Sequence, residues 1–313
     1  MYKYLFFISL LLGCHQDKTP ITNPVSPKVK ADRETANTTS PQWNAHWFDG
    51  KAELTAYHLE QARYGEIRQG EAVTIFVTED FSARKQVKLD HPEAVGTDRI
   101  PVLKMNLTKK FQTGIYPYSL MTSVFTPLQG TSSLKVTTSV QEWCGHVFMQ
   151  YNLKNGQYSF QGLSYFESEG DETGTLPKVL LEDEIWTKLR LNPEQLPTGS
   201  IQVIPATLFS RLHHHPQKAV PAVAEWETAS DDVFGKTPMR VYKLTYTDPE
   251  PRTLRIAIEP NMPYNILGWT ETYQDGFGKS VPLLTKAVRK QTTRLAYWSK
   301  NSNSDLPLRK LLE

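Results

Sequence analysis

The sequence is short of several features that mark large classes of protein. It contains 2 cysteines among 313 residues, too few for a disulfide-stabilised scaffold or a cysteine-rich zinc site. Its 35 lysines and arginines are almost matched by 33 acidic residues, so it lacks the basic excess of a nucleic-acid-binding protein. No hydrophobic run reaches the ~20 residues that a membrane-spanning helix requires. We therefore expect neither a nucleic-acid partner nor a polytopic membrane protein.

Several motifs of known chemistry are also missing. The chain has no G-x-G-x-x-G, no P-loop, no G-x-S-x-G and no H-E-x-x-H. The sequence therefore predicts no cofactor and assigns no catalytic residue. Its composition, 39% hydrophobic and 22% charged, is that of an ordinary globular protein with enough apolar residues for a packed core.

The first fourteen residues carry the most specific motif. Lys3 precedes an apolar run over residues 4–12, which has the length of a signal-peptide core and not of a membrane span. The run ends in Leu-Leu-Gly before Cys14, and this sequence resembles the lipobox of bacterial lipoproteins. In that family a signal peptidase cleaves before the cysteine, whose thiol carries a diacylglycerol. The resemblance implies a signal peptide over residues 1–13 and lipidation of Cys14.

The expected anchor is lipid and not charge. Each buried methylene of an acyl chain contributes ~0.8 kcal/mol to membrane binding. Removal of residues 1–13 takes away one charged residue, Lys3, and leaves basic and acidic residues almost balanced, so attraction to anionic lipid does not supply the anchor. His15 follows Cys14, whereas an aspartate there would resemble the signal that retains enterobacterial lipoproteins in the inner membrane. We therefore expect a membrane-anchored protein at the periplasmic face of the outer membrane. Residues 14–42, rich in proline and polar residues, are predicted to form a disordered tether.

From residue 43 onward the dominant hydrophobic period is two. Such alternation predicts strands with one buried and one solvated face, as in antiparallel sheets. The pattern suggests ten to twelve strands, too many to stay flat in an open sheet. We predict a mainly β fold, a large curved antiparallel sheet resembling a half-barrel, with one amphipathic helix. Apolar positions that alternate in this way are Leu103, Met105, Leu107, Leu134, Val136, Val140, Tyr242, Leu244, Tyr246, Leu254, Ile256 and Ile258.

Turn and helix signals divide the chain further. Asn155-Gly156 predicts a tight hairpin, and Gln69-Gly70 predicts another turn. Residues 178–191 have apolar side chains at spacing four and are predicted to be helical, whereas residues 52–62 are assigned to a strand. Residues 43–313 are expected to form one β-rich domain, which the acidic stretch 167–177 divides into two halves, 43–166 and 178–297, in an alternative interpretation.

Two further resemblances concern the folded part. The hairpin series and the late strands resemble the half-barrel proteins of the lipoprotein-carrier type, LolA and LolB. That resemblance implies a concave apolar face able to take a lipid chain. Residues 47–53, 78–81 and 141–146 resemble an uncharacterised lipoprotein family of Bacteroidota, whose members often carry the label septum formation inhibitor Maf. True Maf proteins have a Ser-x-Ser-Pro-Arg-Arg motif, which is missing here, so that label implies no activity.

Five groups of side chains are candidates for chemistry. His213 and His215 precede Pro216, and an extended backbone would place them on one face as two ligands for zinc or copper, with a third ligand required from elsewhere. Glu225 and Glu227 have the spacing of a carboxylate pair. The other groups are a thiol and imidazole, which we expect to be half-buried, an acidic triplet, which we expect to be solvated, and a set of aromatics for a sugar or lipid platform. These are Cys144 and His146, then Glu182, Asp183 and Glu184, then Trp43, Trp47, Phe48, Trp269, Tyr273, Tyr297 and Trp298.

The sequence thus predicts a cell-envelope lipoprotein with a binding or assembly role. The expected partners are the membrane, through the lipid on Cys14, and an apolar ligand, lipid or envelope protein. A periplasmic hydrolase that uses carboxylates or a histidine-bound metal is the alternative.

Overall fold

The computed structural model describes residues 41–313 except 230–232, 249 and 277–279. The predicted signal peptide, Cys14 and most of the predicted tether lie outside the described residues. Described residues all belong to one compact unit. None of the described helices is long and apolar enough to cross a membrane.

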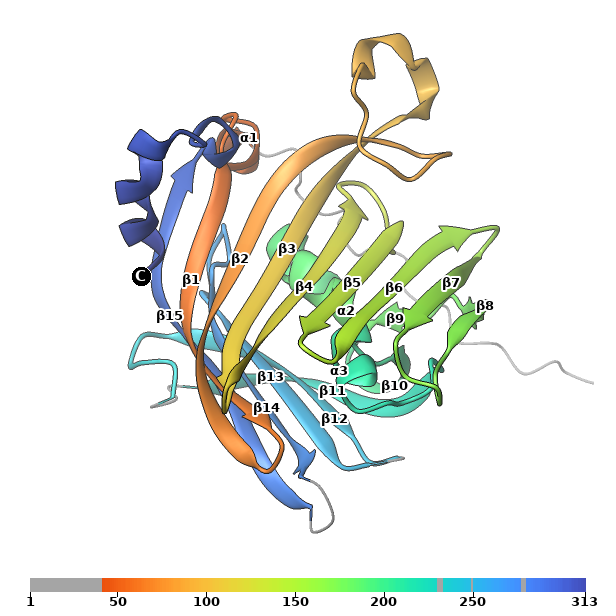
Figure 1. Cartoon of the computed structure of the whole chain (residues 1–313). Helices are drawn as coiled ribbons and strands as arrows, with labels where there is room; N and C mark the ends of the chain where they lie inside the picture. Colours follow the sequence, from red (N-terminus) through yellow and green to blue (C-terminus); the bar gives the residue numbers. More distant parts are fainter. Residues whose placement is uncertain (1–40, 230–232, 249, 277–279) are drawn as a thin grey trace, which may run out of the picture. The chain divides into compact units, whose positions relative to one another are not determined.

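Within the described residues the strands form one curved 15-stranded sheet (Figure 1). The order is β8-β7-β6-β5-β4-β3-β2-β1-β15-β14-β13-β12-β11-β10-β9. Every pairing is antiparallel except the short one between β9 and β10. The strands are β1 (Ala52–Arg63), β2 (Glu66–Ser82), β3 (Arg99–Thr113), β4 (Tyr116–Pro127), β5 (Lys135–Glu142), β6 (Gly145–Lys154), β7 (Gln157–Ser164), β8 (Asp171–Pro177), β9 (Leu180–Leu181), β10 (Gly199–Ile204), β11 (Val220–Ala229), β12 (Met239–Tyr246), β13 (Arg252–Ile258), β14 (Ile266–Asp275) and β15 (Val281–Leu295).

The topology is a meander in which the first and the last strand pair with each other in the middle of the sheet. The first strand, β1, pairs with the last, β15, so the predicted halves lie on either side of this ladder in a single sheet. The two edge strands, β8 and β9, follow each other directly in the chain, and β8 lies within the stretch expected to separate the halves. The predicted fold class, a mainly β protein with a large curved antiparallel sheet, is confirmed, and the described strands outnumber the ten to twelve expected.

Three α-helices accompany the sheet in the described part of the chain. α2 (Glu182–Leu191) and α3 (Thr207–Leu212) lie on the concave side of the sheet, and α1 (Pro41–Trp47) leads into β1 (Figure 1). α2 is the predicted amphipathic helix, and the predicted apolar positions Leu181, Ile185 and Leu189 are fully buried. It starts at Glu182 and not at residue 178, because the two residues before it pair with β10. The helices α1 and α3 were not predicted.

The apolar side chains of the concave face of the sheet pack around α2 and α3. Leu103, Met105 and Leu107 of β3 are all buried, and Lys104 and Thr108 on the other face are partly exposed, but Asn106 on that face is buried as well. The core continues through the concave faces of the other strands and encloses α2 and α3. The helices therefore occupy the space that the curvature of the sheet creates.

The turn predictions had mixed outcomes. Asn155 and Gly156 form the predicted hairpin between β6 and β7, both with positive φ, 50° and 78°. The turn predicted at Gln69-Gly70 is wrong, because β2 runs straight through it and the chain turns earlier, at Tyr64-Gly65. Gly70 is needed for a different reason: a Cβ there would lie 2.3 Å from the carbonyl oxygen of Lys110 on β3.

Candidate functional site

The concave interior contains an unusual number of buried charged groups. The acidic triplet that opens α2, Glu182, Asp183 and Glu184, was expected to be solvated, and that expectation is wrong. The three residues are 2%, 4% and 1% exposed. Each carboxylate has its own partner inside the fold, which is the physical reason why it tolerates burial.

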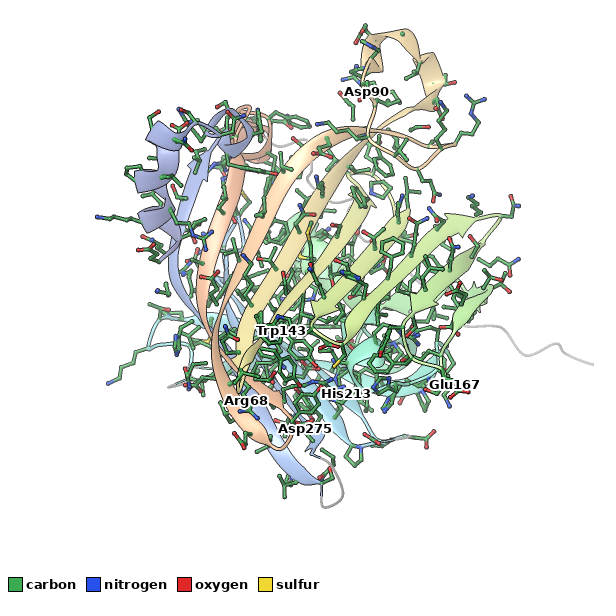
Figure 2. All side chains as sticks on the ribbon, in the orientation of Figure 1. Arg68, Asp90, Trp143, Glu167, His213 and Asp275 are labelled. Atoms are coloured by element: carbon green, nitrogen blue, oxygen red, sulfur yellow. The ribbon has the colours of Figure 1, made fainter. Side chains whose placement is uncertain are left out.

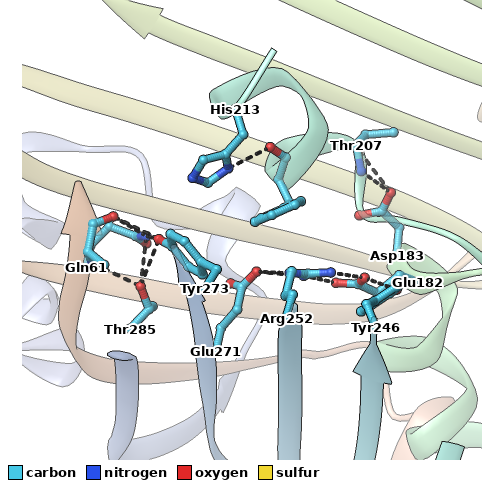
Figure 3. Close-up of polar contacts among 12 residues, drawn as sticks. Gln61, Glu182, Asp183, Thr207, His213, Tyr246, Arg252, Glu271, Tyr273 and Thr285 are labelled. Carbon is cyan, nitrogen blue, oxygen red and sulfur yellow. Dashed lines mark hydrogen bonds and ion pairs between the residues drawn. The ribbon is translucent and has the colours of Figure 1, made fainter. Parts of the chain in front are cut away.

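Glu182 belongs to a chain of ion pairs on the sheet. Arg252 of β13 donates from Nη1 to Glu182 Oε2 at 2.6 Å and from Nε to Glu271 Oε1 at 2.7 Å. The Tyr246 hydroxyl also donates to Glu182. Although burial favours the neutral form, the two carboxylates keep the pKa of Arg252 well above its ordinary value. This guanidinium is therefore a fixed cation that fastens α2 to β13 and β14 (Figure 3).

The other two acids hold further elements in place. Asp183 accepts hydrogen bonds from the backbone N–H and the hydroxyl of Thr207, both at 2.9 Å, and so fastens the start of α3 to α2. Burial raises the pKa of Asp183 to about 7. Glu184 accepts from the N–H of Ser133 at 2.6 Å and forms an i,i+4 ion pair with Lys188 at 3.0 Å.

Two further ionisable groups line the same interior. Lys109 of β3 is 6% exposed, and its Nζ lies 3.4 Å from Gln61 Oε1. Burial lowers the pKa of Lys109. His213 donates from Nδ1 to the carbonyl oxygen of Phe209 at 3.0 Å, while its buried Nε2 has no hydrogen-bond partner among the described residues. Burial lowers the pKa of His213 to about 4, so the ring is neutral at physiological pH.

The space between these groups is small. The cavity that they line with Trp186 and Trp269 has a volume of about 50 Å³. That volume holds a few water molecules, whereas ligand sites measure roughly 300–1,000 Å³. The half-barrel resemblance implied room for a lipid chain inside the curve, but in the described structure α2, α3 and aromatic side chains fill it. The buried charges thus join helices to sheet and do not surround a substrate.

The predicted histidine pair does not lie on one extended strand. His213 ends α3, His214 has a positive φ of 58°, and the His213 and His215 rings are 6.1 Å apart with Phe209 packed against both. Among the described residues no group of three or more His, Cys, Asp or Glu side chains is placed to hold a metal ion. The third ligand that the metal hypothesis requires is therefore not found in this part of the chain.

The other predicted candidates are divided between exposed surfaces and the core. Cys144, expected to be half-buried, is exposed in the turn between β5 and β6, beside Trp143 (Figure 2). His146, expected to be half-buried with it, is exposed as well. Glu225 and Glu227 do share one face of β11, but both form ion pairs with Lys243, at 3.0 and 3.1 Å. Of the aromatics proposed as a platform, Trp43, Trp47, Trp269 and Tyr273 are buried in the core.

A larger space lies on the opposite, convex face of the sheet. The segment η5 (Asn303–Leu312) runs along the outside of β15 and β1 (Figure 1, dark blue). Between it and the sheet is a groove of about 500 Å³. Its floor includes Leu54, Val73 and Ile75, and its other wall carries leucines of η5. We call this space the outer groove.

η5 is held to the sheet by few contacts. Arg309 pairs with Glu71 at 3.0 Å, and Gln291 donates from its side chain to the carbonyl oxygen of Lys310 at 3.0 Å. Leu312 packs on a small apolar cluster that contains Ala52 and Leu54. By contrast Leu306 is 69% exposed. Such a segment sits at the weakly held end of the stability range, because it buries little apolar surface.

Sequence reasoning did not find the outer groove. Its only local signal is a run of leucines interrupted by Pro307, Arg309 and Lys310, which is too short to establish a helix period. The walls come from residues more than 200 positions apart, so their proximity becomes visible only in the folded chain.

Fold and site together define a single curved antiparallel sheet, wrapped round buried helices and carrying a groove on its outer face. No protein-family model and no curated protein matches the chain. A similar solved structure is the crystal structure of a β-barrel-like protein of Domain of Unknown Function DUF1849 from Brucella abortus. It is 10% identical, with a TM-score of 0.45, and the match covers 77% of this chain and 97% of that one.

Proposed function

We propose that this chain is a cell-envelope lipoprotein whose β-rich domain binds a ligand with an apolar part in the outer groove. One observation carries the proposal: about 500 Å³ is open between the sheet and η5, whereas about 50 Å³ is open inside the curve. The first value lies within the range of small-molecule sites and the second does not.

The envelope location is supported by the N-terminal motif. The apolar run of residues 4–12 and Leu-Leu-Gly before Cys14 are what a lipoprotein signal peptidase requires, and two or three acyl chains hold a domain stably at a bilayer. A predicted tether over residues 14–42 would let the described domain stand away from the membrane surface. We place the protein at the periplasmic face of the outer membrane.

Binding is favoured over hydrolysis by the state of the candidate catalytic groups. Glu182 and Glu271 are neutralised by Arg252, and Glu225 and Glu227 by Lys243. A carboxylate pair for glycoside hydrolysis needs one acid of raised pKa beside a free partner and an accessible sugar site. Asp183 has a raised pKa, but it hydrogen-bonds Thr207 inside the closed interior.

The anchor is tested by a Cys14→Ser variant expressed in the native host. We expect the variant to leave the membrane fraction or to accumulate with an uncleaved signal peptide, because serine cannot form the thioether. Cys144→Ser is the matched control and should stay in the membrane fraction, cleaved and lipidated. Full membrane retention of a cleaved Cys14→Ser protein would contradict the lipoprotein assignment.

The groove is tested by native mass spectrometry of the full chain, extracted from host membranes. We expect a bound small molecule that is lost in Leu308→Asp, because a carboxylate in the groove wall opposes an apolar ligand. Leu308 is 38% exposed, so the substitution does not bury a charge in the core. Leu163→Asp, at a 40% exposed position on β7, a strand that lines neither the groove nor the space beside it, should keep the molecule. A bound molecule that survives Leu308→Asp, or no bound molecule in the unaltered protein, would overturn the groove as the ligand site.

A further inference from the structure

The outer groove continues into a second, polar hollow on the same face of the sheet. That hollow has a volume of about 690 Å³, and it shares Glu71, Lys110 and Leu312 with the groove. Its other lining residues include the polar Gln69, Gln112 and Ser119 beside the apolar Phe111 and Pro117, so the lining is more polar than that of the groove. The convex face therefore presents an apolar compartment that opens into a more polar one, called the polar compartment below.

The apolar compartment is built from in-register neighbours. Leu54 of β1 lies opposite Ile75 of β2, and both strands place these side chains on the convex face. Val73 extends the floor toward Lys110, and the partly exposed Leu306 and Leu308 form the wall on η5. An apolar chain in this space would cover leucine surface that is otherwise exposed to water.

The polar compartment carries two cations that are not neutralised. Lys110 and Lys290 line it, and within the described residues neither has a carboxylate at ion-pair distance. Lys290 is the extra residue of a β-bulge, because the β1 partners step from Gln291 directly to Arg289. The bulge turns this lysine to the convex face beside the hollow.

Most neighbouring charges on the same surface are already paired or capped, and the carboxylate of Glu313 is the exception. Arg309 binds Glu71, and the Asp305 carboxylate accepts from the N–H of Ser302 at 3.1 Å. Glu313 also lines the hollow, but no described lysine or arginine lies within ion-pair distance of it. The free cationic positions are thus Lys110, at the junction of the two compartments, and Lys290, in the polar one.

From this arrangement we propose that the ligand of the outer groove is a single-chain anionic amphiphile. Its anionic head lies against Lys110 and Lys290, and its hydrocarbon chain lies between Leu54, Ile75 and the leucines of η5. A chain contributes ~0.8 kcal/mol for each methylene that it buries, and the head adds charge complementarity. The groove volume, at the lower end of the range for small-molecule sites, suits one chain and not two. This inference rests on the proposed binding role of the groove.

Photocrosslinking of the full chain in neutral phosphatidylcholine vesicles tests the proposal. Two probes with the same diazirine-bearing chain are compared at pH 8, a fatty acid and the corresponding fatty alcohol. Labelled peptides are then mapped by mass spectrometry. We expect labels on η5 and on the facing parts of β1, β2 and β15. The acid should label about fivefold more than the alcohol, as expected for two exposed charge pairs.

Lysine variants separate the head group from the groove. Lys110→Gln combined with Lys290→Gln should lower labelling by the acid to the level of the alcohol and leave the alcohol unchanged. Lys154→Gln, an exposed lysine at the far end of β6, should change neither probe. Both lysine positions are exposed, so neither substitution removes a core contact.

Three results would contradict the proposal in distinguishable ways. Equal labelling by acid and alcohol would overturn the anionic head group and leave groove binding standing. A preference for the acid that survives the double lysine substitution would remove the head from Lys110 and Lys290. No labelling of η5, β1, β2 or β15 by either probe would overturn the groove itself.

Discussion

Among single residues, the buried charges decide how this fold is held together. The Arg190 side chain from α2 pairs with Glu53 on β1, with Nη2 at 2.8 Å from Oε2, and His46 also contacts this carboxylate at 3.0 Å. Burial opposes ionisation of Glu53, but Arg190 outweighs it and lowers the pKa of Glu53 to about 2. The two residues are 137 positions apart in the sequence, so a local sequence pattern does not reveal the pair.

Replacing Glu53 by glutamine leaves Arg190 buried without its counter-charge. We expect the free energy of unfolding to fall by ~3–5 kcal/mol, the usual cost of breaking a buried pair from one side. Urea denaturation followed by tryptophan fluorescence measures this change. Glu225→Gln removes one partner of an exposed pair and should cost under ~1 kcal/mol. Equal effects of the two substitutions would contradict the structural role of the Glu53–Arg190 pair.

His213 should make the fold sensitive to moderate acid. Its pKa is about 4 in the folded chain, against 6.5 when unfolded, because burial, helped by Arg63 and His215, outweighs the hydrogen bond to Phe209 and the charge of Asp275. The unfolded state therefore binds more protons between these values, and stability is lost as pH falls from about 6.5 to 4, by up to ~3 kcal/mol. In His213→Gln the loss over this window should be smaller. His58→Gln, at an exposed position, should leave the pH profile as it was, and an unaltered profile in His213→Gln would refute the assignment.

Secondary-structure elements were predicted well where the signal is local. The Asn155-Gly156 turn and the strand at residues 103–107 each depend on a few neighbouring residues, and both are confirmed, although Asn106 on the face expected to be solvated is buried. Sequence spacing also located α2, but not the burial of its acidic first turn, because Arg252 and Thr207 lie far along the chain. α3 was missed because its six residues are too few to show a helical period.

Gly70 shows how a turn-forming residue can serve a strand. Because its missing Cβ would clash with the Lys110 carbonyl and with the Phe111 Cβ at 2.8 Å, we expect Gly70→Ala to destabilise the fold by ~1–3 kcal/mol. Thermal unfolding monitored by circular dichroism measures the effect. Gly130→Ala, in an exposed loop where the nearest atom is a proline carbon at 3.3 Å, should change stability by less than ~1 kcal/mol. A neutral Gly70→Ala would mean that β2 and β3 are further apart there.

The shape of the described domain results from a sheet that has too many strands to remain flat. The curvature was predictable from the number of strands, whereas the way its interior is filled was not, since that depends on contacts between α2, α3 and strands from both halves. For the same reason the sequence pointed toward a ligand inside the curve. The described structure has a closed, charged interior and places open space outside, beneath η5.

Hydrogen–deuterium exchange of the full chain in neutral phosphatidylcholine vesicles, with and without dodecanoate, tests the location of the ligand most directly. The outer groove predicts slower exchange in η5 and in the facing part of β15 when dodecanoate is present. Exchange in α2 and α3, which line the closed interior, should not change. Protection confined to α2 and α3, or no protection anywhere, would contradict binding on the convex face.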